Sequence, residues 1–284
     1  LKLACIGGHS DCVELLLNAN AALDDDDGSR LDIVEADGST MLLYAAQRTH
    51  HRIPKHDDGH VRTVKLLLAA KAKPDQTRWD GLTPLAYSCM YGDAESARLL
   101  LEYHAQPSKR DEAGWPPLLW AAIRGHTACV KLLIDEYAVP ADEARPNGCT
   151  ALMAASLSGS VDCVDALIQS GARIDARTAC VGYSTQGLGG RGLSALMLAA
   201  KHGHSRCVRR LLDANASTTL LDASGATAMG HATRGGHVAC ASLLAGDDEL
   251  LFGGGDGEQT VVVLDEGFLP QAPAASGPLF GPIP

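Results

Sequence analysis

The feature that most constrains this chain is a repeat with a basic period of 33 residues. A glycine followed by histidine or another small polar residue recurs with spacings of 51, 33, 33, 34, 44 and 33 residues, at Gly8, Gly59, Gly92, Gly125, Gly159, Gly203 and Gly236. A second series keeps the same phase, at Gly38, Gly81, Gly114, Gly148, Gly192 and Gly225. Such periodicity predicts stacked copies of one small unit. The two long intervals predict loop insertions near residues 47–58 and 177–190.

Each copy is predicted to contain a turn and two helices. In the clearest copy, residues 80–107, Thr83 can cap a helix that Pro84 begins, because proline at the first helical position loses no needed hydrogen bond. Equivalent hydroxyls are Thr40, Thr150, Ser194 and Thr227, and Pro116 replaces this residue once. The Gly-His step ends the first helix, and a leucine-rich second helix follows. One copy cannot bury that apolar stripe alone, so the copies must stack.

These motifs, recurring in fixed order, resemble the ankyrin repeat family from Leu1 to about residue 246. The resemblance implies a mainly α solenoid of antiparallel helix pairs with β-hairpin fingers, in about seven copies. It also implies that the imidazole of each Gly-His step ties neighbouring turns together. The first copy is truncated, so we expect the natural chain to extend before Leu1, and targeting signals there cannot be read. Gly230 and His231 occupy helix-facing positions of the last copy, which predicts a frayed end.

Composition separates a repeat domain, residues 1–246, from a tail, residues 247–284. The chain has 24 Lys and Arg against 34 Asp and Glu, a net charge of -10, which argues against nucleic-acid binding. The tail contains seven acidic residues, no Lys or Arg and five prolines, so we expect it to be disordered. No run of about 18 apolar residues predicts membrane insertion. The acidic run 24–27 is interpreted as a solvated linker.

The residues that could form a catalytic, cofactor or metal site are better explained by the structure of the repeat and its loops. The sequence therefore predicts no catalytic, cofactor-binding or metal-binding residue. The histidine-rich insertion, from His50 to His60, lacks cysteine and a recognised ligand spacing. The GLGGRG run at 187–192 lacks the strand and helix that a dinucleotide site needs. Seven of the nine cysteines are predicted to be core thiols (Cys5, Cys12, Cys89, Cys129, Cys163, Cys207 and Cys240), which favours a reducing compartment, the cytoplasm or also the nucleus. Cys149 and Cys180 are predicted in turns, without an adjacent base.

Recognition of a protein partner is the function that the resemblance implies. Partners of ankyrin repeat domains usually contact the concave face of the stack. On this sequence, the resemblance predicts a site made of Trp79, Asp80, Leu82, Met90, Tyr91, Glu112, Trp115, Ile123 and Arg124. Aromatic rings and arginine are frequent interface anchors. An alternative is that Trp79 and Trp115 only pack finger against finger, and Trp120 is predicted to be core. A second functional class also stays open: a targeting or regulatory segment of a larger enzyme, ubiquitin-ligase subunit or channel.

Overall fold

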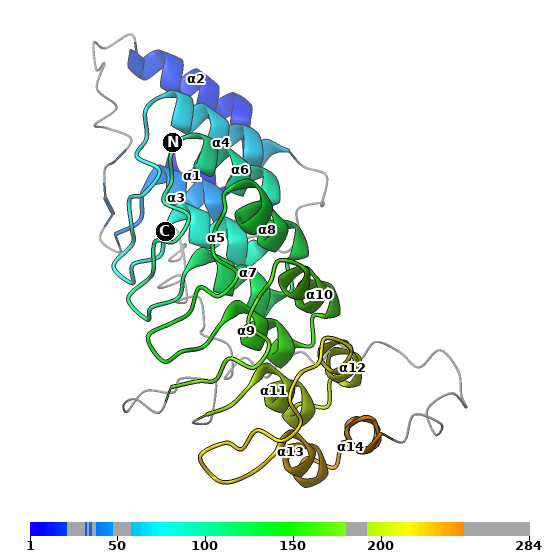
Figure 1. Cartoon of the computed structure of the whole chain (residues 1–284). Helices are drawn as coiled ribbons and strands as arrows, with labels where there is room; N and C mark the ends of the chain where they lie inside the picture. The colour runs from blue at the N-terminus through cyan, green and yellow to red at the C-terminus, as the bar shows by residue number, and fades with distance from the viewer. Residues whose placement is uncertain (22–31, 33, 36–37, 48–57, 180–191, 247–284) are drawn as a thin grey trace, which may run out of the picture.

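The chain folds into a stack of helix pairs arranged in two rows (Figure 1). The structure, a computed structural model, describes residues 1–21, 32, 34–35, 38–47, 58–179 and 192–246. The tail, the acidic run 24–27, the GLGGRG run except Gly192 and most of both insertions lie outside these residues. The inner row contains α1 (Lys2–Ile6), α3 (Met41–Ala46), α5 (Pro84–Tyr91), α7 (Pro117–Arg124), α9 (Ala151–Ser158), α11 (Ala195–Lys201) and α13 (Ala228–Arg234).

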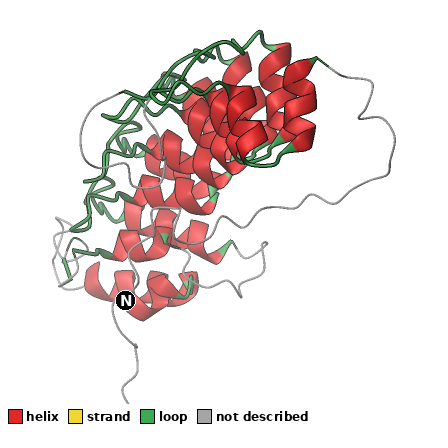
Figure 2. Cartoon of the chain, turned by 90° about the horizontal axis from the view of Figure 1, so that it is seen from below, coloured by secondary structure: helices red, strands yellow, loops and turns green. Residues whose placement is uncertain are grey.

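The helices of the outer row are antiparallel to those of the inner row and pack on the side of the inner row that faces away from the fingers. It contains α2 (Ser10–Ala21), α4 (Gly59–Ala69), α6 (Ala94–Glu102), α8 (Thr127–Lys131) continued by a π-helical turn (Leu132–Glu136), α10 (Val161–Gln169), α12 (Ser205–Asp213) and α14 (Val238–Ala245). The loops that join successive copies gather along one side of the stack (Figure 2). They form fingers beside the inner helices, which gives the molecule a face between the fingers and the inner row.

The predicted caps are present at the start of the inner helices. The hydroxyl oxygen of Thr83 accepts a hydrogen bond from the Ala86 amide at 3.1 Å. The side chain before α7 is Pro116, which makes no cap bond. Equivalent cap bonds of 3.2 to 3.4 Å are formed by Thr40, Thr150, Ser194 and Thr227. Five of the seven inner helices therefore begin directly after a capping hydroxyl that the sequence specifies, which fixes the register of these copies.

Three of the five histidines of the Gly-His steps join neighbouring copies, as the resemblance implied, whereas His60 contacts Ala45 of its own copy. The Nε2 atom of His126 donates to the carbonyl oxygen of Met90 at 3.1 Å, and burial is the main reason that the pKa of His126 is lowered. His204 and His237 donate in the same way to Leu157 and Lys201, at 2.9 and 3.0 Å. Gly92 has φ +76°, and a Cβ atom there would lie 2.5 Å from His126 Nδ1. Only glycine fits this contact without strain.

The described fingers are tight hairpin turns, each closed by a backbone hydrogen bond such as that from the Arg78 amide to the Leu82 carbonyl at 3.2 Å. The described residues contain one isolated β-bridge, between Ala144 and Thr150. Two sequence expectations are corrected in the finger and end regions. The Thr178 amide donates to the Leu193 carbonyl at 3.0 Å, so 177–179 belong to the finger and not to the insertion. The last copy forms two helices, and His231 is a buried residue of α13.

Burial of the cysteines confirms the core prediction at six of its seven positions and corrects it at one. Cys5, Cys89, Cys129, Cys163, Cys207 and Cys240 are buried. Cys12 is exposed, because no described residue packs over its side of the first helix pair. Cys149 lies in a finger, outside the helices, as predicted; it is fully buried there, and burial raises its pKa to about 12. Cys180 lies outside the described residues.

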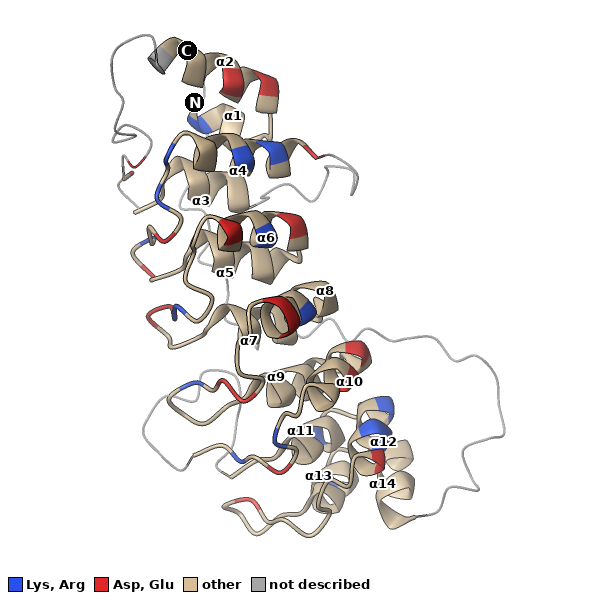
Figure 3. Ribbon diagram, turned by 45° about the horizontal axis from the view of Figure 1, so that its top comes forward, with Lys and Arg blue, Asp and Glu red and all other residues tan. Residues whose placement is uncertain are grey.

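Ion pairs connect successive outer helices. Arg62 of α4 lies 2.9 Å from Asp11 of α2, and Arg210 of α12 lies 3.3 Å from Asp165 of α10. Most of the charged residues lie on the outer helices and on the fingers (Figure 3). These exposed pairs contribute little individually to stability. Burial of the apolar side chains between the rows therefore supplies most of the stabilisation.

Candidate functional site

The nine predicted site residues lie between the fingers and the inner helices, but they differ widely in exposure. Trp79 is 64% exposed, and Glu112 is also exposed. Asp80, Tyr91 and Arg124 are partly exposed. The remaining four side chains are 2 to 3% exposed: Leu82, Met90, Trp115 and Ile123. These four belong to the core beneath the face, which corrects the expectation that a partner could contact them.

Trp115 has a packing role. Its ring stacks on Trp120 with the centroids 4.9 Å apart, and the guanidinium of Arg145 lies 4.4 Å from the Trp115 centroid. Trp120 is buried, as predicted, and its Nε1 atom donates to the carboxylate of Asp111 at 3.1 Å. The two rings thus bind a finger to its inner helix. Of the two candidate tryptophan anchors, Trp79 is the one accessible to a partner.

Trp79 and Tyr91 rest on a polar cluster that the sequence interpretation missed. Arg78 is 5% exposed, and its Nη1 atom donates to the Tyr87 hydroxyl at 3.2 Å. The same guanidinium lies 5.6 Å from the Trp79 ring centroid and 3.6 Å from an Asp80 carboxylate oxygen. Tyr87 stacks on Tyr91 with the centroids 6.3 Å apart. Buried side chains therefore hold the exposed tryptophan and the half-buried tyrosine in place.

The Arg78–Tyr87 contact belongs to a recurring link between a finger and its inner helix. In three copies the linked residues are nine positions apart: Arg78 with Tyr87, Asp111 with Trp120, and Asp222 with His231. The residue types differ between copies, but in each of the three a finger side chain bonds to a side chain nine positions later on the inner helix. A search for polar pairs at this spacing in the sequence would have found all three.

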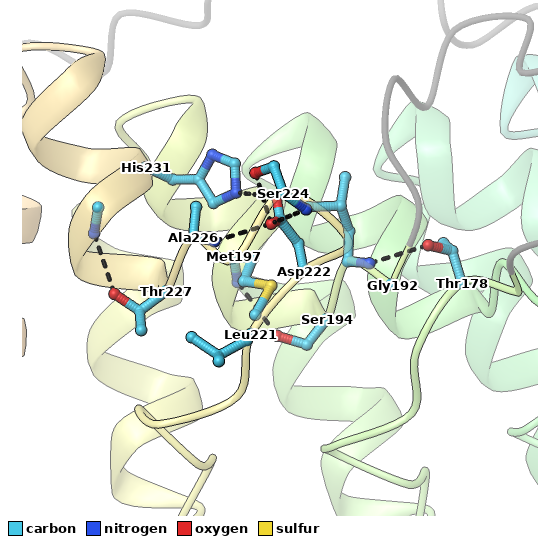
Figure 4. A network of polar contacts seen from close by, with 12 residues as sticks. Thr178, Gly192, Ser194, Met197, Leu221, Asp222, Ser224, Ala226, Thr227 and His231 are labelled. Carbon is cyan, nitrogen blue, oxygen red and sulfur yellow. Dashed lines mark hydrogen bonds and ion pairs between the residues drawn. The ribbon is translucent and has the colours of Figure 1, made fainter.

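The Asp222–His231 link is the most extensively bonded of the three (Figure 4). His231 Nε2 lies 2.9 Å from one Asp222 oxygen, while the other oxygen accepts from the Ser224 and Ala226 amides at 2.8 and 2.9 Å. Burial by itself would raise the pKa of Asp222. Its hydrogen bonds outweigh that effect and hold the pKa well below its ordinary value. This network anchors the last finger to α13.

Arg124 is the one Lys or Arg among the nine predicted site residues. It ends α7, and its Nε atom is buried without a hydrogen-bond partner. Burial lowers the pKa of Arg124, an effect that the nearby Tyr91 opposes. Arginine stays protonated near neutral pH, so Arg124 places a charged, half-buried guanidinium beside Tyr91. A charge-assisted hydrogen bond from this guanidinium to a carboxylate would be favourable.

The described residues contain no group of three or more His, Cys, Asp or Glu side chains able to hold a metal ion. His60 is fully buried, and its Nδ1 atom lies 3.2 Å from the Ala45 carbonyl oxygen. The rest of the predicted histidine-rich loop, from His50 to Asp57, lies outside the described residues. Among the helices that the structure describes, none combines the length and the apolar composition needed to span a bilayer.

Comparison with known proteins agrees with this architecture. The human ASB11 ankyrin repeat domain has a TM-score of 0.66 at 24% identity, covering 86% of this chain and 96% of that chain. The ankyrin repeat domain of Bcl-3, described as a unique member of the IkappaB protein family, has a TM-score of 0.62 at 24% identity, covering 84% and 96%. At this identity the two structures show the fold alone, and no curated protein matches the sequence. The family described as ankyrin repeats (3 copies) matches residues 55–138, 104–178 and 181–250. The chain therefore belongs to the ankyrin repeat family.

Proposed function

We propose that this chain is a non-catalytic protein-binding module that holds a segment of a partner on the face between its fingers and inner helices. Ankyrin repeat domains generally bind proteins, and five predicted site residues remain accessible on this face: Trp79, Asp80, Tyr91, Glu112 and Arg124. Unpaired and mostly buried thiols suit a reducing compartment, and we propose the cytoplasm, with the nucleus also open.

The observation that carries this proposal is an exposed tryptophan on a rigid support. Trp79 leaves 64% of its surface in water, and its ring centroid lies 5.6 Å from the guanidinium of Arg78, which a hydrogen bond to Tyr87 holds in place. A large ring that is already fixed loses little conformational entropy when it is covered. Tryptophan and tyrosine are enriched among the residues that dominate binding energy.

Quantitative affinity capture with the full chain tests the proposal. Trp79→Ala and Tyr91→Ala are compared with Tyr103→Ala, an exposed aromatic at the end of α6 on the outer row. A direct partner should be lost from both concave-face variants and retained by the Tyr103 control. For a purified partner, Trp79→Ala should weaken binding by about 2 kcal/mol, or roughly 30-fold. Partners that all three variants retain equally would place the binding surface elsewhere.

A further inference from the structure

The ends of the inner helices carry a charge pattern opposite to that of the chain. In the last five copies, two residues precede each glycine of the Gly-His series: Met90–Tyr91, Ile123–Arg124, Leu157–Ser158, Lys201–His202 and Arg234–Gly235. We call these ten residues the helix-edge row. The row contains three cations and no carboxylate, in a chain with 34 acidic and 24 basic residues. The row therefore favours an anionic ligand although the whole chain is acidic.

The acidic groups of this face belong to the fingers and leave Arg124 without a carboxylate partner. Asp80 is occupied by Arg78 at 3.6 Å, and Asp111 accepts from Trp120 and from the Trp115 amide. Glu112 is exposed on its finger, and Arg124 has no hydrogen bond or ion pair to any described residue. A half-buried guanidinium without a counter-charge has already lost part of its hydration. A ligand carboxylate can therefore pair with it at a lower desolvation cost.

The rest of the row extends this preference along the stack. His202 adds no charge at neutral pH, because burial and the neighbouring Lys201 lower its pKa to about 4. Arg234 is exposed at the end of α13. Packed helices lie about 10 Å apart, and an extended chain rises about 3.3 Å per residue, so one copy corresponds to about three residues of a ligand.

We propose that the helix-edge row binds an acidic, extended segment of another protein. An apolar side chain of that segment packs on Trp79 and Tyr91, and a carboxylate about three residues away pairs with Arg124. Further carboxylates about six and nine residues beyond the first reach Lys201 and Arg234. This assignment rests on the proposed function and specifies the chemistry of its partner.

Selection from a library of random peptides about 16 residues long tests the assignment, since that length spans about five copies, from Tyr91 to Arg234. The full chain, Trp79→Ala, Arg124→Glu and a control, Arg206→Glu on the exposed side of α12, are used as baits. The full chain and the control are expected to enrich acidic peptides. Trp79→Ala should lose them, and Arg124→Glu should select neutral or basic peptides instead. The same enrichment is expected when the seven acidic residues of 247–284 are changed to Asn or Gln in the full chain.

The outcomes separate this assignment from the proposed function. Enrichment that depends on Trp79 but shows no acidic excess would overturn the assignment and leave the binding function intact. Acidic enrichment that Arg124→Glu leaves unchanged would also overturn the assignment. If no enrichment depends on Trp79, the proposed function itself fails.

Binding of one selected peptide, followed by fluorescence anisotropy, gives the magnitude. Changing its Asp and Glu residues to Asn and Gln should weaken binding at least about tenfold, and Arg124→Ala should have a similar effect. Arg206→Ala should leave the affinity unchanged. Single-stranded DNA of about 30 nucleotides that binds as tightly as the peptide would show a general attraction for polyanions and overturn the assignment.

Discussion

Replacing Trp115 by alanine should destabilise the fold far more than replacing Trp79, although both tryptophans lie on neighbouring fingers. Trp115 is 2% exposed, and removing a buried tryptophan costs about 3 to 5 kcal/mol. Loss of the stack with Trp120 adds about 1 kcal/mol, and loss of the Arg145 contact adds about another. Collapse of Arg145 and Trp120 into the vacated space offsets part of this. We expect a net loss of about 4 kcal/mol.

Trp79→Ala is the matched control, because it removes the same ring from an exposed position. Its effect on the free energy of unfolding should stay within about 0.5 kcal/mol. Urea denaturation followed by far-ultraviolet circular dichroism measures both variants without depending on tryptophan fluorescence. A loss below about 1 kcal/mol for Trp115→Ala, or equal losses for the two variants, would refute the assignment of Trp115 to packing and Trp79 to the accessible face.

Three further outcomes follow from buried polar groups and thiols. Asp222→Ala should cost about 2 kcal/mol and speed hydrogen exchange in α13 and α14 more than elsewhere, because His231 and two backbone amides lose their acceptor. Thermal stability should fall as the pH drops from 7 toward 4. Burial is the main cause of a lowered pKa at His126, His202 and His204, so these histidines stabilise the fold above about pH 6.5 and lose that contribution when they are protonated. A melting temperature that rises over this range would contradict the prediction. A thiol reagent mapped by mass spectrometry should modify Cys12 in the native protein and leave Cys149 unmodified until unfolding, and rapid native labelling of Cys149 would contradict its burial.

Local chemistry was enough to predict the repeat architecture. The cap at Thr83 and the end of α7 at Gly125 each depend on residues close in the sequence, and the structure has both where they were expected. Exposure was less predictable. Cys12 occupies the same repeat position as Cys129, yet only Cys129 has a helix pair on both sides.

The candidate site required knowledge of how each finger folds back on its helix. Sequence position alone could not show that Trp115 is covered by Arg145 while Trp79 stays in water, since both flank a finger glycine. The supporting residues Arg78 and Tyr87 are not evident from any single repeat position, because their hydrogen bond joins two positions of one copy. The nine-residue spacing that links them was present in the sequence and needed comparison between copies.

The helix contacts run within each pair and from one pair to the next along both rows. A force applied between the ends of the stack would therefore act on one junction after another rather than on the whole core at once. Each copy that detaches would release about 33 residues, or roughly 100 Å of extended chain. A ligand lying across several copies would bridge those junctions, so it would raise the force at which the spanned copies unravel.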